Sequence, residues 1–182
     1  MPSNVNELLQ YLDDQRAVLH AAVASVPEAH HHVSPGEGRW SVANVLEHLA
    51  TVESRIAVML RPKIAEARAK GESSGGVSAE ASAPPIDLSR LLDRTRRVHA
   101  SAASQPSGAL DSAAALAALE QSRAAMRETV RETEGAPLHA VSMPHPVLGP
   151  LDLDGWIRFI GAHEARHAAQ ILEIGASLGA RA

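Results

Sequence analysis

The sequence contains no cysteine, and this absence excludes several kinds of site within the chain. Disulfide bonds, cysteine-ligated zinc sites and a cysteine nucleophile all need a thiol that these 182 residues do not supply. Aromatic residues make up only 2% of the chain, whereas 45% of the residues are hydrophobic and alanine is abundant. Because strands favour aromatic and β-branched residues, a core built from alanine and leucine favours helices.

The chain also lacks a basic excess, a long apolar run and a signal peptide. Its 17 basic and 21 acidic residues give a formal net charge of −4, so we expect no nucleic-acid partner. No apolar run reaches the length of a bilayer-spanning helix, and the opening MPSNVNELLQ lacks the pattern of a secretory signal. We therefore expect a cytoplasmic protein that does not associate with membranes.

Four long segments have the apolar spacing of amphipathic helices. At the start of the first, Asn4 and Glu7 form a capping-box pattern, and Asp111 is a suitable cap for the third. We find no convincing strand and no internal repeat. The sequence therefore predicts an all-α fold, a four-helix bundle, with helices over residues 4–26, 41–70, 111–134 and 152–178.

A long connection separates the second and third predicted helices within a single domain over residues 1–182. Residues 71–86, GESSGGVSAEASAPPI, are rich in glycine, serine and proline. We therefore predict a flexible linker over residues 71–108, with a short helix near residues 87–97. A connection of this length lets the chain cross between helices 2 and 3 of the bundle.

The fourth predicted helix has two histidines within its apolar stripe. At about 100° per residue, one narrow arc contains Trp156, Ile160, His163, His167 and Ile174. Imidazole is an awkward core filler, because its two nitrogens need a donor and an acceptor as partners. Side chains at i and i+4 are close enough to hold one ion with ligand bonds of about 2.0–2.1 Å. This pair therefore supplies two ligands of a predicted metal site.

His48 is the best candidate for a third ligand. It lies in the middle of the second predicted helix, beside Val45 and Val52, at the edge of the apolar stripe. Three neutral histidines with a vacant position are typical of a catalytic metal; Zn²⁺ fits best, and Ni²⁺ and Fe²⁺ are alternatives. In the opposing interpretation, the histidines are core residues with satisfied hydrogen bonds. His145, between two prolines, is a minor candidate to approach the metal.

Glu164, Gln170 and Arg123 are weaker candidates for a role in catalysis. The string HEARH matches the H-E-x-x-H pattern of zinc proteases, in which the glutamate is the general base, but too little chain follows His167 for the usual distant third ligand. Gln170 falls beside His163 and is suited to bond a ligand, a substrate or a backbone group. For Arg123 we favour an ion pair with a bundle glutamate over an anchor for an anionic substrate.

Two segments together resemble the DinB/YfiT-like superfamily. They are WSVANVLEHL at residues 40–49, and HPVLGPLDLDGW followed by HEARHAAQI within residues 145–171. The resemblance extends from the first helix to the end of the fourth, although residues 70–105 fit poorly. It implies a four-helix bundle, often dimeric, whose metal is held by one histidine of the second helix and an H-x-x-x-H pair of the fourth. Those positions correspond to His48, His163 and His167.

The resemblance also implies thiol-dependent S-transferases and isomerases that use low-molecular-weight thiols such as bacillithiol or mycothiol. A metal with an open position can lower the pKa of a thiol, which suits a chain without its own cysteine. We therefore expect a metal-dependent S-transferase, with a small thiol and an electrophile as partners and a homodimer as its assembly. Two alternatives are a metal-dependent hydrolase, with Glu164 or a bound water as base, and a noncatalytic, stress-related metal- or ligand-binding bundle.

Overall fold

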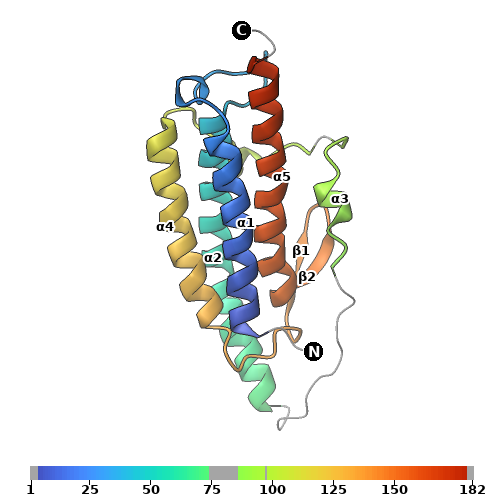
Figure 1. Cartoon of the computed structure of the whole chain (residues 1–182). Helices are drawn as coiled ribbons and strands as arrows, with labels where there is room; N and C mark the ends of the chain where they lie inside the picture. Colours follow the sequence, from blue (N-terminus) through green and yellow to red (C-terminus); the bar gives the residue numbers. More distant parts are fainter. Residues whose placement is uncertain (1–3, 74–85, 97, 180–182) are drawn as a thin grey trace.

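The computed structural model describes residues 4–73, 86–96 and 98–179. Four long helices lie side by side (Figure 1): α1 (Val5–Ala24), α2 (Val42–Ser73), α4 (Ser112–Arg131) and α5 (Leu153–Gly179). Helix α2 packs mainly on α4, and α1 packs mainly on α5. The predicted all-α four-helix bundle, with a long connection between its second and third long helices, is confirmed. The shorter elements are η1 (Glu28–His30), α3 (Ser89–Leu92), η2 (Ala102–Ser104), β1 (Ser142–His145) and β2 (Gly149–Asp152).

The long helices begin at side chains that satisfy their first free amides. The Asn4 side chain accepts a hydrogen bond from the Glu7 amide at 3.0 Å, and Glu7 reaches back to the Asn4 amide in a complete capping box. Asp111 caps α4 by accepting from the Ala114 amide at 2.8 Å. Both caps agree with the sequence prediction, whereas α4 ends earlier than the predicted Glu134.

A two-stranded antiparallel hairpin precedes α5, although the sequence predicted no strand. Its register places Met143 opposite Leu151 and Pro144 opposite Pro150. Proline is rare in strands because it cannot donate a ladder hydrogen bond, so the two prolines conceal the hairpin in the sequence. In a two-stranded sheet both strands are edges, where proline is tolerated. Gly149, with a φ of 80°, supplies the left-handed backbone next to the turn.

The connection from α2 to α4 lies partly against the bundle. The short helix expected near residues 87–97 is α3, and its Leu91 is buried in the core. Helix α2 continues to Ser73, beyond the start of the predicted linker. The middle of that predicted linker, residues 74–85, is outside the described residues. In Figure 1 the segment that contains α3 runs beside α5.

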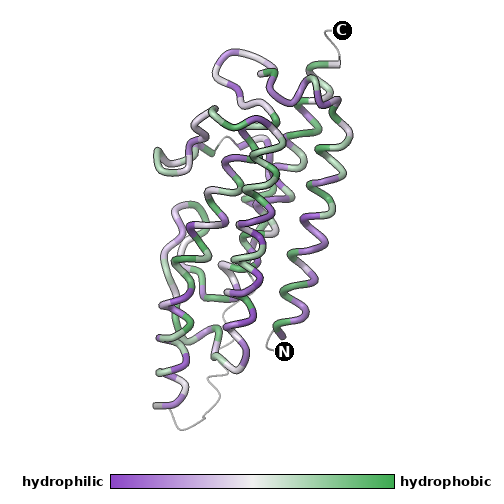
Figure 2. The backbone as a smooth tube through the Cα atoms, turned by 90° about the vertical axis from the view of Figure 1, so that its left-hand side faces the viewer, coloured by the Kyte–Doolittle hydropathy of each residue, from purple (hydrophilic) through white to green (hydrophobic). Residues whose placement is uncertain are grey.

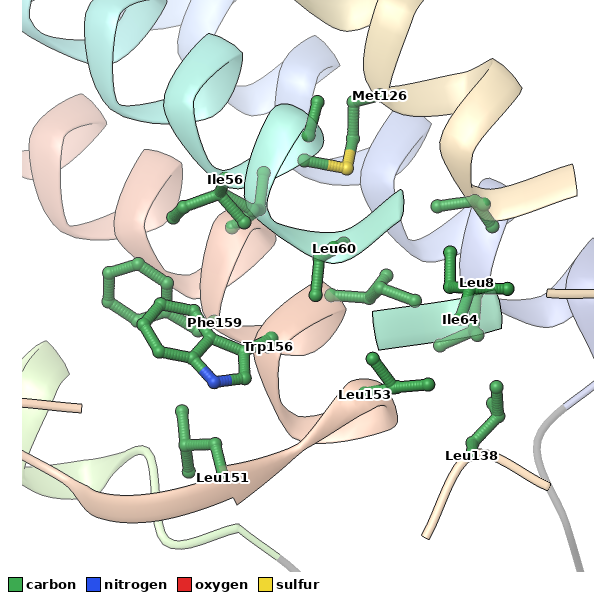
Figure 3. Close-up of a cluster of buried hydrophobic side chains, with 14 of the residues drawn as sticks. Leu8, Ile56, Leu60, Ile64, Met126, Leu138, Leu151, Leu153, Trp156 and Phe159 are labelled. Atoms are coloured by element: carbon green, nitrogen blue, oxygen red, sulfur yellow. The ribbon is translucent and has the colours of Figure 1, made fainter. Parts of the chain in front are cut away.

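Buried hydrophobic residues form two clusters, one toward each end of the bundle. Figure 2 shows hydrophobic and hydrophilic residues alternating along the helices, as expected for amphipathic segments. Figure 3 shows the first cluster, in which the α5 aromatics lie beside β2 and α2. The first cluster includes Leu8, Leu12, Ile56, Leu60, Met126, Trp156 and Phe159. The second includes Leu19, Val45, Leu49, Leu119, Ile171 and Ile174.

Helices α1 and α5 approach closely at Gly161. A Cβ atom at this position would lie 2.8 Å from Cζ of Tyr11, which is too close for any side chain without a shift of the ring. The Tyr11 hydroxyl is itself held, because it donates to the Arg158 carbonyl at 3.2 Å. This glycine therefore sets the distance between α1 and the helix that carries His163 and His167.

None of the helices in the described parts of the chain combines the length and the hydropathy that a membrane-spanning segment requires.

Candidate metal centre

Three histidine side chains from two helices meet at one point. The Nε2 atom of His163 lies 3.3 Å from Nε2 of His48 and 3.1 Å from Nε2 of His167. One ligand atom from each residue lies within 4.8 Å of the others. Among the described residues, this is the group of three or more histidine, aspartate or glutamate side chains that could hold a metal ion. The structure thus brings together the three residues that the sequence singled out.

Hydrogen bonds on the far side of two rings orient the cluster. Nδ1 of His48 lies 2.6 Å from the carbonyl oxygen of Ser104, and Nδ1 of His167 lies 2.8 Å from Oε1 of Gln170. Both partner atoms are acceptors, so each Nδ1 carries the proton and donates it. In a neutral ring the lone pair then belongs to Nε2, which is the atom that points into the cluster. Gln170 therefore has the supporting position that the sequence analysis gave as one of its interpretations.

The distances from His163 Nε2 to the other two Nε2 atoms fit a divalent metal. Tetrahedral ligands at about 2.0–2.1 Å from an ion are about 3.3 Å apart, close to these two distances. With His48 and His167 donating from Nδ1, two lone pairs are directed at the same small volume. A cation in this volume would accept both lone pairs at once.

Burial keeps the three rings neutral, the form that binds metals. Burial is the main cause that lowers the pKa of His48, and it lowers the pKa of His163 well below its ordinary value, with further contributions from His167 and His48. Burial also lowers the pKa of His167 to about 3. At neutral pH the rings are therefore uncharged, and the Nε2 lone pairs of His48 and His167 are available to a cation.

Aromatic rings form the sides of the cluster. The Trp40 ring lies 4.8 Å from the His48 ring, and Phe159 stacks on His163 with ring centroids 5.2 Å apart. His48 and His167 are buried, whereas His163 and Trp40 remain partly exposed.

His145 packs against Phe159, and hydrogen bonds occupy its Nδ1 atom, which is therefore not free to bind a metal. Its ring centroid is 4.4 Å from that of Phe159. Its Nδ1 atom accepts hydrogen bonds from the amides of Val147 at 3.2 Å and Leu148 at 3.1 Å. This Nδ1 is therefore an acceptor that closes the hairpin turn, and the proton of the neutral ring is on Nε2. His145 is outside the group that could hold a metal.

A layer of four charged side chains separates the two hydrophobic clusters, and each long helix contributes one of them: Arg16, Glu53, Arg123 and Glu164. All four side chains are at most 7% exposed. The Arg16 guanidinium lies 3.0 Å from Glu53 and 2.7 Å from Glu164. The Arg123 guanidinium lies 2.7 Å from each of the same two carboxylates. Two positive and two negative charges therefore neutralise one another inside the bundle.

This layer accounts for two of the weaker candidates. Arg123 forms the ion pair with bundle glutamates that the sequence analysis favoured, and it also donates to the Leu12 carbonyl at 2.6 Å. One oxygen of Glu164 accepts from Arg16 and the other from Arg123. Burial raises the pKa of Glu164, while the two arginines act in the opposite direction. Both side chains therefore form ion pairs within the charged layer.

Several residues that contact the cluster or its surroundings were not predicted from the sequence. Ser104 bonds His48 through a backbone carbonyl, which no side-chain pattern reveals. Arg16 and Glu53 interrupt apolar stripes in the same way as Arg123, and that interruption was the signal that could have identified them. Glu47 and Arg166 bind the backbone of the connection between α2 and α4, from positions far away in the sequence.

A cavity of about 390 Å³ lies elsewhere, between the end of α1 and the start of α4. His31 lines it and is buried, and Nε2 of this ring lies 2.9 Å from the Val26 carbonyl. The residues around this cavity do not include His48, His163 or His167. The chemistry of converging histidines, rather than the size of a cavity, therefore marks the candidate site.

Fold and site together define a class of protein, a four-helix bundle with a buried histidine cluster suited to a divalent metal. A family model described as the DinB superfamily matches residues 6–171, and the chain belongs to this superfamily. The resemblance found in the two sequence motifs is thus confirmed. The chain is similar to YuaE of Bacillus subtilis (strain 168), an uncharacterized protein, with 27% identity over 141 residues, or 77% of this chain and 80% of that protein. No solved structure matches the chain.

Proposed function

We propose that this protein is a metal-dependent S-transferase that activates a low-molecular-weight thiol and transfers it to an electrophile. The observation that carries the proposal is the convergence of three Nε2 atoms, two of which have their lone pairs directed inward by hydrogen bonds from Nδ1. His48, His163 and His167 would hold the ion, with Zn²⁺ as the best fit to three imidazoles and Ni²⁺ or Fe²⁺ as alternatives. We also propose that it acts in the cytoplasm, as a homodimer.

A divalent metal with an open position lowers the pKa of a thiol that binds there, and so supplies a thiolate near neutral pH. The chain has no cysteine, so the reacting sulfur must arrive with the cosubstrate. In the transfer, a bond forms between this sulfur and the electrophilic carbon, and the bond from that carbon to its leaving group breaks. The thiol proton leaves with the departing group, so no oxidant or reductant is needed.

The residues around the cluster support this chemistry in three ways. Ser104 and Gln170 keep the Nε2 lone pairs directed inward. Trp40 and Phe159 exclude water from two sides of the histidine rings, which strengthens electrostatic interactions within the site. His163 is less buried than the other two histidines, and we propose that thiol and electrophile approach from its side.

The hydrolase alternative receives less support from the geometry. A general base needs a free lone pair within reach of an attacking water. Both oxygens of Glu164 instead accept hydrogen bonds from arginines of the charged layer. A protease-like role for the HEARH string would require this carboxylate to leave two buried ion pairs.

Two measurements test the proposal. Elemental analysis of the purified protein should find about one divalent metal per chain, lost in His48→Ala and His167→Ala and retained in His20→Ala, a variant of an exposed histidine. A thiol-transfer assay with small thiols and an alkyl or aryl chloride should then show turnover that His163→Ala abolishes. Absence of metal after reconstitution with Zn²⁺ and Ni²⁺, or activity unchanged in His163→Ala, would refute the proposed function.

A further inference from the structure

Residues 86–96 and 98–108, which we call the strap, are held against the bundle by a buried arginine. Arg166 of α5 is only 6% exposed. Its Nη1 atom donates to the carbonyls of Leu91 at 2.6 Å and Asp93 at 2.8 Å, and its Nη2 atom donates to the carbonyl of Arg96 at 2.8 Å. One guanidinium thus binds three backbone oxygens at and after the end of α3. Arg166 is also the residue directly before the candidate ligand His167.

A buried glutamate holds the other end of the strap. Glu47 of α2 is 8% exposed. Its Oε1 atom accepts from the Ser107 amide at 2.8 Å and from the Ser107 hydroxyl at 2.5 Å, and its Oε2 atom accepts from the Gly108 amide at 3.1 Å. Burial alone would raise the pKa of Glu47, but these hydrogen bonds outweigh it and lower the pKa. Glu47 is also directly before the candidate ligand His48.

Between these two anchors the strap touches the histidine cluster. The carbonyl of Ser104, in η2, accepts the hydrogen bond from His48 Nδ1 at 2.6 Å. Because this acceptor belongs to the backbone, its position depends on what holds the chain on either side. Ser107 is three residues away and is fixed by Glu47. The strap therefore supplies the atom that selects which His48 nitrogen is free to bind a metal.

We infer that Glu47 and Arg166 are positioning residues of the metal centre, which hold the strap so that the Ser104 carbonyl fixes the tautomer and orientation of His48. This inference rests on the proposed metal binding. Glu47 directly precedes the candidate ligand His48, and Arg166 directly precedes His167. Both of these preceding residues bind the strap and not the ion.

Coupling between the strap and the metal must be reciprocal, because two events that favour the same arrangement favour each other equally. An ordered strap raises metal affinity, and a bound metal makes the strap harder to release. Release can be followed with trypsin, which cleaves after lysine or arginine. Residues 71–89 contain neither, whereas Arg90, Arg94 and Arg96 lie in the strap.

The experiment combines zinc affinity with cleavage of the strap. Zinc affinity is measured by competition with a chromophoric chelator for wild type, Glu47→Ala, Arg166→Met and Ser107→Ala. The matched control is Arg68→Met, since Arg68 also donates to two backbone carbonyls, those of Glu132 and Glu134, away from the cluster. Trypsin cleavage in the strap is followed in the same proteins, with and without zinc.

We expect Glu47→Ala and Arg166→Met to weaken zinc binding by about 10- to 100-fold and to speed cleavage of the strap. Arg68→Met should leave both unchanged, and zinc should slow cleavage in wild type. Glu47→Gln, which keeps one acceptor oxygen, should recover part of the affinity. If Glu47→Ala does not fold, the exposed Ser107→Ala still removes one of the three hydrogen bonds and should give a smaller loss.

The outcomes separate the two proposals. Wild type that binds no zinc would refute the proposed function together with this inference. Wild type that binds zinc, with unchanged affinity in Glu47→Ala, Arg166→Met and Ser107→Ala, would overturn the positioning roles alone. Faster cleavage without a change in affinity would also overturn them, because the strap would then be free to move without effect on His48.

Discussion

Arg123 of α4 and Glu164 of α5 form a buried ion pair, with Nη2 and Oε2 2.7 Å apart, directly beside the residue that supplies the central imidazole of the cluster. The Glu164 carboxylate also binds Arg16, and Arg123 also binds Glu53. This pair belongs to a neutral set of four charges, so a change at one member leaves the other three unbalanced in the core.

Glu164→Gln should therefore destabilise the bundle strongly. Removing one partner of a buried ion pair leaves an uncompensated charge and costs about 3–5 kcal/mol. Urea unfolding of metal-free protein measures this loss. Glu120→Gln is the matched control, because Glu120 also binds Arg16 but its side chain is 53% exposed. Its cost should be below about 1 kcal/mol. Equal losses in the two variants would contradict the structural role of the layer.

Gln170 should raise the affinity of the site for zinc through its hydrogen bond with His167. Gln170→Leu removes the acceptor of the His167 Nδ1 proton, so zinc affinity should fall by about 10- to 100-fold. Gln170→Glu keeps an acceptor and should retain the affinity. Gln121→Leu, at an exposed position of α4, controls for the loss of an amide. Competition with a chelator gives all four affinities, and an unaltered affinity in Gln170→Leu would show that His167 needs no such support.

Metal-free protein should lose stability as the pH falls. The folded-state pKa of His167 is about 3 and those of His48 and His163 are also lowered, whereas unfolded histidine titrates near 6.5. Below about pH 6.5 these histidines bind protons in the unfolded chain but stay neutral in the folded protein. The unfolding free energy should then decrease by up to about 1.4 kcal/mol per pH unit for each such histidine.

For His167 this loss should continue down to about pH 3, where its folded form also binds a proton. Chemical unfolding at pH 7, 6 and 5 checks the slope. In His167→Phe the unfolding free energy should depend less steeply on pH than in wild type, since the unfolded variant binds one proton fewer. Identical slopes would mean that His167 is protonated in the folded state at these pH values.

Gly161→Ala should weaken the packing of α1 on α5. The added methyl group would meet the Tyr11 ring, and overpacking of this kind costs about 1–3 kcal/mol. Gly179→Ala is the control, because no atom lies within 4 Å of a Cβ at the end of α5. Thermal and urea unfolding compare the two variants. A smaller loss for Gly161→Ala in a Tyr11→Leu background would locate the clash at this ring.

Local chemistry allowed much of the fold and the core of the site to be predicted. Two helix starts could be predicted from Asn4, Glu7 and Asp111. Capping joins residues that are three positions apart, so the pattern is visible in the sequence. His163 and His167 could be paired because a helix places i and i+4 on one face. His48 could be added because it is a histidine near the apolar stripe of another long helix.

The features that escaped prediction depend on contacts between distant residues or on the backbone. The hairpin was concealed by Pro144 and Pro150, and the Ser104 carbonyl has no side-chain signature. Arg16 and Glu53 were visible as charges within apolar stripes, but their partners are on other helices. Only the folded bundle shows that these charged side chains lie at the same position along its axis and contact one another.

The layer of Arg16, Glu53, Arg123 and Glu164 makes the order of assembly matter. Because each long helix brings one charge, any three of the helices leave a net charge of one in this layer. Such three-helix intermediates are costly, so docking of the last helix and neutralisation of the core are the same event. Folding to this arrangement should therefore be cooperative across all four helices, and sliding α2 along α5 by one turn would break the same contacts. The three histidines, which come from two of these helices, are thereby held in a fixed register along the bundle by charged side chains that are not among the candidate ligands.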